Sequence, residues 1–222
     1  MSSEHTPTRA PLNRERVLRT AIALADAGGI ESLSMRKLGQ ALGVEAMSLY
    51  NHVANKDDLL DGIVDLVLSE IELSPVADDW KLAMRASAVS AHEALLRHPW
   101  ACSLILSPNT MRLIPARMRY MESILRRLRE AGLPAALTYH GYHAIDSHIL
   151  GFTLWEVGHA IDTDQIPDVS AAFLREFPAG DYPYLAEHVE QHLSEGSQHD
   201  EGEFDFGLDL ILDGLERRAV AA

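Results

Sequence analysis

Residues 33–60 read LSMRKLGQALGVEAMSLYNHVANKDDLL, and this stretch decides the fold. Ser34 is a typical N-cap residue, and the apolar spacing that follows it predicts a helix over residues 35–42. Gly43 ends that helix, and after a three-residue turn a second short helix is predicted over residues 46–52. Two short helices joined in this way are typical of a helix-turn-helix, whose second helix enters the major groove of DNA. The same pattern also occurs as a packing corner that binds nothing.

The segments on either side of this pair are predicted to be helices as well. Asn13 is the expected N-cap of a first helix that ends at residues 28–29, both of which are glycine. Asn55 is the expected N-cap of a helix after the pair, and Asp57 and Asp58 in its first turn suit the positive end of the helix dipole. That fourth helix is apolar over most of its girth, which predicts that it lies between two layers of the protein.

The rest of the chain predicts an all-α protein. From Trp80 onward every readable segment has helical spacing, and none alternates as a strand does. Residues 98–115 hold three prolines and are predicted to be irregular, and a short helix is predicted over residues 170–177. The expected division is a flexible arm over residues 1–11, a helix-turn-helix unit with its linking helix over 12–72, and a larger helical domain over 80–222.

Composition limits what the molecule can contact. Acidic residues outnumber basic ones 33 to 19 among the 222 residues, so the net charge of −14 excludes a protein that coats nucleic acid or membrane by bulk charge. Residues 1–52, in contrast, carry six basic side chains against five acidic ones, so any contact with DNA is local. The chain shows no apolar run long enough to cross a membrane and no secretion signal, and its single cysteine, Cys102, cannot form an internal disulfide. We therefore expect a cytoplasmic protein without membrane contact.

Residues 33–60 resemble the DNA-binding signature of the TetR family of transcriptional repressors, with the Gly-Val turn, the Leu-Tyr pair, the histidine and the following lysine in register. The closing segment FGLDLILDGLERR, residues 206–218, resembles the last helix of the tetracycline-repressor branch. The resemblance implies a three-helix helix-turn-helix domain, joined by a linking helix to a larger helical domain that binds an effector and dimerises. It further implies a ligand-responsive repressor that binds palindromic double-stranded operator DNA as a homodimer and is released by a small molecule.

The resemblance also assigns roles on the DNA side. The side chains implied to face bases are Arg36, Ala46, Met47, Ser48 and Asn51. The side chains implied to hold phosphates are Ser34, Tyr50, His52 and Lys56. Arg36 suits a bidentate contact with guanine, Asn51 suits adenine, and Lys56 stands where the first turn of a helix can bind a phosphate.

Two departures from the tetracycline-repressor branch concern the effector. Ile105 matches the position of a drug-binding histidine of that branch, and the linking helix ends in Glu70, Ile71 and Glu72 where the branch has another histidine. We therefore expect an effector other than a magnesium–tetracycline chelate, with no cofactor and no metal. Because Lys56 and Glu70 stand at opposite ends of the linking helix, that helix is expected to couple the effector to the DNA.

Two helical rows of apolar and small residues are predicted to form the dimer face. Glycine inside a helix costs ~1 kcal/mol relative to alanine, so glycines in register indicate a close approach of backbones. The predicted face comprises Ser147, Gly151, Gly158, Phe204, Gly207, Leu208, Ile211, Gly214 and Leu215. Packing of the same rows within one chain is the alternative.

An effector cavity is predicted between the helices of the larger domain. Aromatic and aliphatic side chains with few charges favour a mainly apolar or aromatic ligand. The predicted lining comprises Trp100, Cys102, Leu104, Ile105, His148 and Trp155. Packing in the core is the alternative for each of them.

The eleven histidines leave a different class of function open. His140 and His143 lie three residues apart, and His188 and His192 lie four apart, so each pair shares one face of a helix. A helical metal-dependent hydrolase or a metal-responsive regulator is therefore the alternative, although a zinc site needs a third and a fourth ligand. The sequence carries no nucleophile elbow, phosphate-binding glycine loop or zinc-protease motif, so we do not expect an enzyme.

Overall fold

The computed structural model describes residues 11–73, 79–107, 113–158, 181–194 and 202–220. Its helices are α1 (Arg14–Gly28), α2 (Met35–Leu42), α3 (Ala46–Leu49), α4 (Lys56–Ser69), α5 (Trp80–Arg97), α6 (Trp100–Leu106), α7 (Pro115–Glu130), α8 (Ala135–Gly158), α10 (Pro183–Ser194) and α11 (Glu203–Val220), with a short 3-10 turn, η1 (Ile30–Ser32), after α1. The described residues contain no strand, which confirms the all-α class. Nearly all of the predicted arm over residues 1–11 and the whole of the predicted helix over 170–177 lie outside the described residues.

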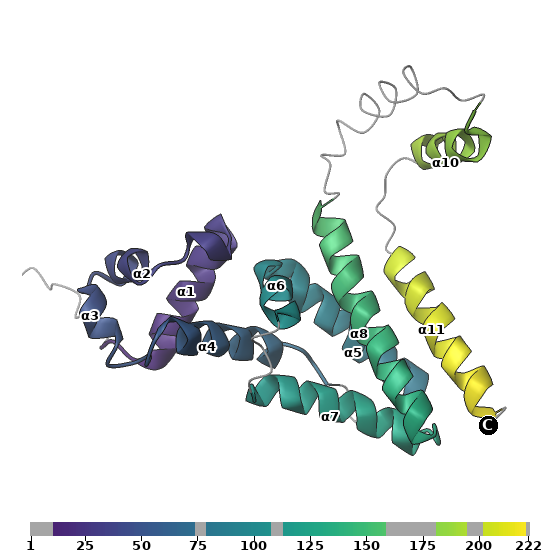
Figure 1. Cartoon of the computed structure of the whole chain (residues 1–222), viewed down its shortest axis with the longest axis horizontal. Coiled ribbons are helices and arrows are strands. Elements are labelled where there is room, and N and C mark those ends of the chain that lie inside the picture. The colour runs from purple at the N-terminus through teal and green to yellow at the C-terminus, as the bar shows by residue number, and fades with distance from the viewer. Residues whose placement is uncertain (1–10, 74–78, 108–112, 159–180, 195–201, 221–222) are drawn as a thin grey trace, which may run out of the picture.

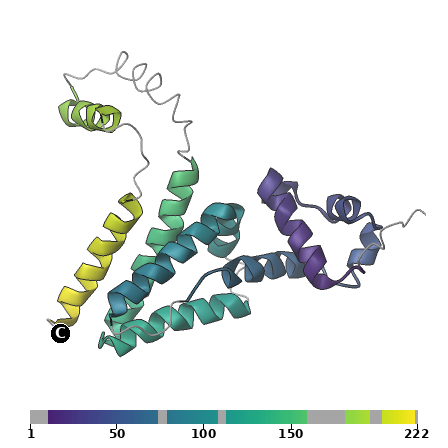
Figure 2. The ribbon, with the colours of Figure 1, turned by 180° about the vertical axis from the view of Figure 1, so that it is seen from behind.

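Two groups of helices meet along α4 and α6 (Figure 1). Helices α1, α2 and α3 lie at one end of the molecule, and α5, α7, α8 and α11 form a bundle at the other. Views from both sides place α6 between α1 and the bundle, and α11 alongside α8 at the outer edge (Figures 1 and 2). As predicted, the fourth helix lies between two layers, because α4 packs against α1 on one side and against α5, α6 and α7 on the other. In the described ranges, no helix combines the length and the apolarity that crossing a bilayer needs.

The predicted N-caps explain where three of the DNA-side helices begin. The side-chain oxygens of Asn13, Ser34 and Asn55 each accept a hydrogen bond from the backbone N–H three residues further on, at 2.8, 3.3 and 2.8 Å respectively. Each bond satisfies an N–H group that has no partner inside its own helix. All three predicted caps are confirmed.

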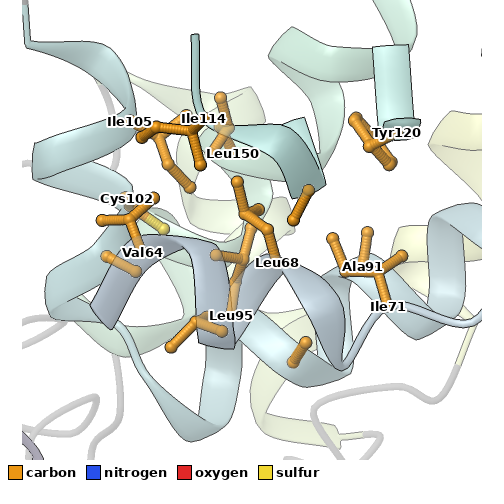
Figure 3. Packing of buried hydrophobic residues seen from close by; sticks show 14 of the residues in the cluster. Val64, Leu68, Ile71, Ala91, Leu95, Cys102, Ile105, Ile114, Tyr120 and Leu150 are labelled. Carbon is orange, nitrogen blue, oxygen red and sulfur yellow. The ribbon is translucent and has the colours of Figure 1, made fainter. Parts of the chain in front are cut away.

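The buried apolar side chains form one cluster that runs through both groups of helices. Near α1, Leu59 and Ile63 of α4 are fully buried. Toward the bundle, Val64 and Leu68 of α4, and Ile71 just after it, lie among side chains of α5, α6, α7 and α8 (Figure 3). Because one helix supplies both sides, the DNA-side helices and the bundle share their apolar interior.

The second helix of the short pair is shorter than predicted. The α-helical part of α3 ends at Leu49 rather than near His52. The amides of residues 50, 51 and 52 instead bond to the carbonyl groups three residues earlier, at 3.3, 3.4 and 2.9 Å. The chain therefore continues in tighter 3-10-type turns, which carry Asn51 and His52.

The prediction of an irregular stretch over residues 98–115 is wrong for residues 100–106, whereas residues 108–112 lie outside the described residues. This stretch holds α6 and the first residue of α7. Pro99 stands at the N-cap of α6, and Pro115 is the first residue of α7. Proline is tolerated at these positions because the first N–H groups of a helix have no partner within it. The two prolines therefore begin helices here rather than break them.

Candidate DNA-binding face and effector cavity

The turn between α2 and α3 depends on two glycines. A Cβ atom on Gly39 would lie 2.8 Å from the carbonyl oxygen of Val44 and 3.2 Å from the first amide nitrogen of α3, so a larger residue would push the helices apart. Gly43 has φ 66° and ψ 41°, a left-handed conformation that glycine reaches without strain. Leu38 and Leu49 are fully buried beneath the turn. These contacts fix the orientation of α3 relative to α2.

The five side chains assigned to the bases are accessible to different degrees. Arg36, Met47 and Asn51 are exposed, with 75% of Met47 accessible, and Ala46 and Ser48 are half-buried. The contacts of all five with bases remain predictions.

The four side chains assigned to phosphates also lie at the surface. Ser34, Tyr50 and Lys56 are exposed, and His52 is half-buried. Lys56 is the first residue of α4, where the N–H groups and the dipole of the helix also favour an anion. The Ser34 oxygen accepts the capping bond from the backbone, which leaves its hydroxyl hydrogen able to donate to a phosphate oxygen. These phosphate contacts remain predictions.

An ion pair that the sequence pattern does not reveal joins the beginnings of α1 and α4. The Arg14 guanidinium donates to both carboxylate oxygens of Asp58, at 2.8 and 2.7 Å, and to the carbonyl oxygen of His52 at 2.9 Å. The Asp58 carboxylate also accepts the N–H of Ala54 at 2.8 Å. These hydrogen bonds, above all the one from Arg14, hold the pKa of Asp58 below its usual range. Arg14 therefore orders the turn after α3 and joins it to α1.

A cavity of about 730 Å³ lies between α6, α7 and α8. It is lined by Ile105, Leu106, Ser107, Leu113, Arg117, Met118, Met121, Tyr142, His143, Asp146, Ser147, Leu150, Gly151 and Leu154. This volume falls in the range of small-molecule sites, ~300 to 1,000 Å³. A crevice of about 20 Å³ shares several of these walls and reaches Leu68 and Ile71 at the end of α4.

Polar side chains from α7 and α8 interrupt the apolar walls of the cavity. Burial raises the pKa of Tyr142 to about 12, so this phenol is a hydrogen-bond donor at neutral pH. Burial also raises the pKa of Asp146, an effect that the positive charge of Arg117 partly offsets. Arg117 itself donates to the carbonyl oxygen of Ile105 at 3.3 Å. The sequence pattern missed this polar group, because only folding brings α7 and α8 together.

Five of the six side chains predicted to line the cavity lie elsewhere, and Ile105 alone of the six lines it. Cys102 is fully buried in the shared core (Figure 3), where burial raises the pKa of its thiol to about 11. Trp100 is also buried, and its indole N–H donates to Asp26 at 2.7 Å. Leu104 is partly buried against the core. For these three residues, the alternative of packing in the core is therefore correct.

The other two predicted cavity residues lie on the far side of α8. His148 Nε2 is 2.8 Å from the carbonyl oxygen of Phe204, and its ring stacks on that of Phe204 with centroids 4.9 Å apart. His148 therefore joins α8 to α11. Trp155 is 41% exposed and lies against Phe152 of the same helix, with ring centroids 5.6 Å apart.

The α11 part of the predicted dimer face is mostly used inside one chain. Phe204, Leu208 and Leu215 are buried, because that side of α11 packs against α8. A Cβ atom on Gly207 would collide with the His148 ring, so this glycine permits a contact within the chain. Ile211 is partly buried against the same core. The alternative of packing within one chain is therefore correct for these residues.

The opposite side of α11 and one side of α8 are open. On α11, Phe206 and Leu210 are 67% and 57% exposed, and a Cβ atom on Gly214 would meet nothing within 4 Å. The exposed members of the predicted face on α8 are Ser147, Gly151 and Gly158. Helices α8 and α11 lie side by side at the edge of the bundle (Figure 2). An apolar face with small residues is thus present, but on α11 it follows a different stripe from the predicted one.

A buried histidine joins α5 to α8. His92 Nδ1 lies 2.8 Å from the hydroxyl oxygen of Thr153, and His92 Nε2 lies 3.0 Å from a carboxylate oxygen of Glu156. The ring stacks on Phe204 of α11, with centroids 4.3 Å apart. Burial lowers the pKa of His92, and Glu156 offsets this only in part. The folded protein therefore favours the neutral imidazole.

We expect this histidine to make the protein less stable as the pH falls from about 7 to 5. An unfolded histidine takes up a proton near its ordinary pKa of ~6.5, whereas the lowered pKa delays uptake in the folded state, so acid favours unfolding. Thermal melting across this range measures the effect. The His92→Gln protein, which lacks this titration, should show a smaller decline in Tm, and equal declines in both proteins would contradict the expectation.

For the metal-dependent alternative, the part of the chain that the structure describes supplies no set of metal ligands. No group of three or more histidine, cysteine, aspartate or glutamate side chains there could hold a metal ion. The rings of His140 and His143 instead contact the ring of Tyr139, with centroids 5.4 and 4.5 Å apart. The side chain of His192 lies outside the described part.

Comparison with known proteins agrees with the two parts of this geometry. Residues 17–63 match the model of bacterial regulatory proteins of the tetR family, and residues 74–219 match that of the tetracyclin repressor-like C-terminal domain. The HTH-type transcriptional repressor DrrR1 of Streptomyces coeruleorubidus is 32% identical over 95% of this chain and 80% of its own length. The class D tetracycline repressor protein of Escherichia coli is 31% identical over 96% of this chain and 93% of its own.

A solved structure covers nearly the same span. The TetR family protein ActR of Streptomyces coelicolor, in complex with (S)-DNPA, is 31% identical and superposes with a TM-score of 0.73 over 95% of this chain and 100% of its own. The helix-turn-helix, the larger helical domain and the likeness to the tetracycline-repressor branch are therefore confirmed. Proteins of this kind are transcription factors and not enzymes. The chain belongs to the TetR family, as a transcriptional repressor with a ligand-binding domain.

Proposed function

We propose that this repressor binds a palindromic operator as a homodimer and releases it when a small, mainly apolar or aromatic molecule enters the cavity between α6, α7 and α8. The observation that carries the proposal is that one chain with one shared core holds both an accessible helix-turn-helix and a cavity of about 730 Å³. Residues 12–72 supply the DNA-binding part, and residues 80–222 supply the effector-binding and dimerisation part.

On the DNA side, α3 and the turns after it enter the major groove. Arg36 and Asn51 contact base edges, because a guanidinium and an amide can each form two hydrogen bonds there. Lys56 and Tyr50 hold phosphates on either side of the groove, which sets the position of the reading residues. The exposure of these four side chains supports this arrangement.

Two copies meet through the open sides of α8 and α11. A palindrome presents the same half-site twice, so a two-fold symmetric dimer supplies the second helix-turn-helix that it requires. Phe206 and Leu210 provide exposed apolar area, and burying such area favours association. Gly214, which has open space at Cβ, lets the helices of two copies approach closely.

The walls of the cavity define what the effector offers. ActR has been solved in complex with (S)-DNPA and with actinorhodin. These complexes support a small organic effector for the present protein as well. In this chain Met118, Met121 and Leu150 provide apolar walls, and the Arg117 guanidinium provides hydrogen-bond donors. The effector is therefore a molecule with an apolar or aromatic body and an oxygen that accepts hydrogen bonds, and it brings no metal.

We expect Arg36→Ala and Lys56→Ala to weaken operator binding in different ways. The Arg36 variant loses contacts with one base, so it should relax preference at one position at a cost of ~1 to 3 kcal/mol. The Lys56 variant loses a phosphate contact, so it should weaken all sites about equally and reduce the dependence of affinity on salt. Selection of sites from random duplexes, followed by affinities at several salt concentrations, measures both effects.

Arg19→Ala is the matched control, because Arg19 is exposed on α1 and pairs with Glu15 of the same helix. It should leave base preference unchanged. A wild-type protein that selects no palindrome at low salt would overturn the proposed function. An Arg36 variant with unaltered base preference would remove that residue from the base-contacting set.

A further inference from the structure

The turn that joins α5 to α6 is bonded to both long helices of the DNA-binding part. His98 Nδ1 and the indole N–H of Trp100 both lie on the same Asp26 oxygen, at 2.8 and 2.7 Å, and Asp26 belongs to α1. His98 Nε2 lies 3.3 Å from one oxygen of Glu70, and Arg97 donates to the other at 2.8 Å. Glu70 is the C-cap residue of α4. We call these five residues the interdomain clamp.

The positions of the two carboxylates are not explained by the helices that carry them. Asp26 stands in the last turn of α1, and Glu70 stands at the end of α4. A negative charge is unfavourable at the C-terminal end of a helix, because the dipole is negative there. Both carboxylates are instead held by groups of the neighbouring domain. His98 itself is 9% exposed, so the clamp is partly shielded from water, which strengthens its hydrogen bonds.

Helix α6 links this clamp to the cavity. Its first residue is Trp100, which bonds to Asp26, and its last turn carries Ile105 and Leu106, which line the cavity. The helix spans ~10 Å at 1.5 Å per residue, so it behaves as one short rigid element between the two sites. A displacement at its cavity end therefore moves the donors that hold α1.

Helix α4, through which coupling is expected, also extends from the cavity side to the DNA side. Ile71, next to the clamp residue Glu70, lines the small crevice beside the cavity. Helix α4 is held to α7 by the bond from the Ala116 N–H to Asp65 at 2.7 Å. A movement of α4 acts on α1 through their shared packing and the Arg14–Asp58 ion pair, whereas a movement of α6 acts on α1 through the bond from Trp100 to Asp26.

We propose that Asp26 is a positioning residue through which occupancy of the cavity reaches the DNA-binding helices, with α6 as the connecting element. This inference rests on the proposed function, since it concerns how the effector controls the operator. Trp100 and His98 set the position of Asp26, and Asp26 sets the orientation of α1. Because α1 packs against α2, the orientation of the helix-turn-helix follows.

A double-mutant cycle tests this without knowledge of the effector. Met118→Trp adds a large side chain to a cavity wall and imitates occupancy, and Asp26→Ala removes the acceptor of the clamp. In the otherwise wild-type protein, Met118→Trp should lower affinity for a selected operator by about 10-fold, within the ~5- to 150-fold range of allosteric coupling. In the Asp26→Ala protein the same substitution should lower affinity by at most about 3-fold.

Three controls separate coupling from general damage. Leu82→Trp places the same side chain on an exposed position of α5 outside the cavity walls, and it should have no effect on operator affinity. Asp26→Asn keeps an acceptor oxygen and should restore most of the response to Met118→Trp. Glu31→Ala removes an exposed carboxylate nearby and should leave the response intact. If the Asp26→Ala protein fails to fold, Trp100→Phe takes its place in the double-mutant cycle, because this substitution removes the indole N–H that donates to Asp26.

The outcomes are distinguishable. A response to Met118→Trp that persists in the Asp26→Ala protein overturns the role of Asp26 and leaves the proposed function standing. No response in the wild-type background, with operator binding intact, also overturns the inference. Failure of the wild-type protein to bind any selected palindrome overturns the proposed function, and the inference falls with it.

Discussion

Replacing Phe206 by glutamate is expected to convert the dimer to monomers and to reduce operator affinity by at least about 100-fold. Phe206 is 67% exposed on the open side of α11, and the two-fold axis brings two copies of it into the proposed interface. Losing a large aromatic contact costs ~2 kcal/mol or more at each copy, and 1.4 kcal/mol changes an equilibrium tenfold. In addition, the two glutamate carboxylates would lose their hydration when two copies associate, which opposes dimer formation. Sedimentation and operator binding measure the two effects.

Gly207→Leu is the instructive control for this experiment. Gly207 belongs to the predicted dimer face, but its Cβ position points into His148 of the same chain. This substitution should therefore lower Tm, while any folded protein remains dimeric. If Gly207→Leu gave monomers and Phe206→Glu gave dimers, the interface would lie on the side of α11 that carries Gly207. That result would contradict the proposed face.

Gly39→Val is expected to abolish operator binding and to lower the stability of the DNA-binding part by ~1 to 3 kcal/mol or more. The Cβ position of Gly39 is 2.8 Å from a backbone carbonyl oxygen, and backbone atoms cannot turn aside as a side chain can. The clash therefore displaces α3 from α2. Thermal melting and binding to a labelled operator measure the effect.

Gly43→Asn provides the matched control in the same turn. Gly43 is exposed and has a left-handed backbone, and asparagine adopts that conformation at little cost. The Gly43 variant should therefore keep most of its operator affinity. Full operator binding by Gly39→Val would show that α3 does not rest on Gly39 as the structure places it.

The DNA side was largely predictable from the sequence, because its signals are local. The N-caps Asn13, Ser34 and Asn55 act on amides three residues away, and Gly43 acts on its own backbone. Such signals lie within a few residues of one another in the chain. The Arg14–Asp58 ion pair was missed for the opposite reason, since it joins residues that are far apart in the sequence.

The effector side was less predictable because apolar residues serve several purposes. Trp100 and Cys102 are suitable cavity residues by type, but their neighbours in three dimensions place them in the clamp and in the core. On α11, Phe204 and Phe206 have the same side chain and opposite surroundings. Helical spacing shows that two sides of a helix are apolar, and only the fold shows which side meets the same chain.

The position of α4 has a consequence for building hybrid regulators. Its first half packs on the DNA-side helices, and Val64, Leu68 and the following Ile71 fill the interior of the bundle (Figure 3). In a fusion cut after α4, these side chains would have to pack against an unrelated ligand-binding domain, or they would be exposed to water. Transplanting the DNA specificity of this protein therefore means exchanging α2 and α3 alone, or redesigning the bundle-facing half of α4 to suit its new host.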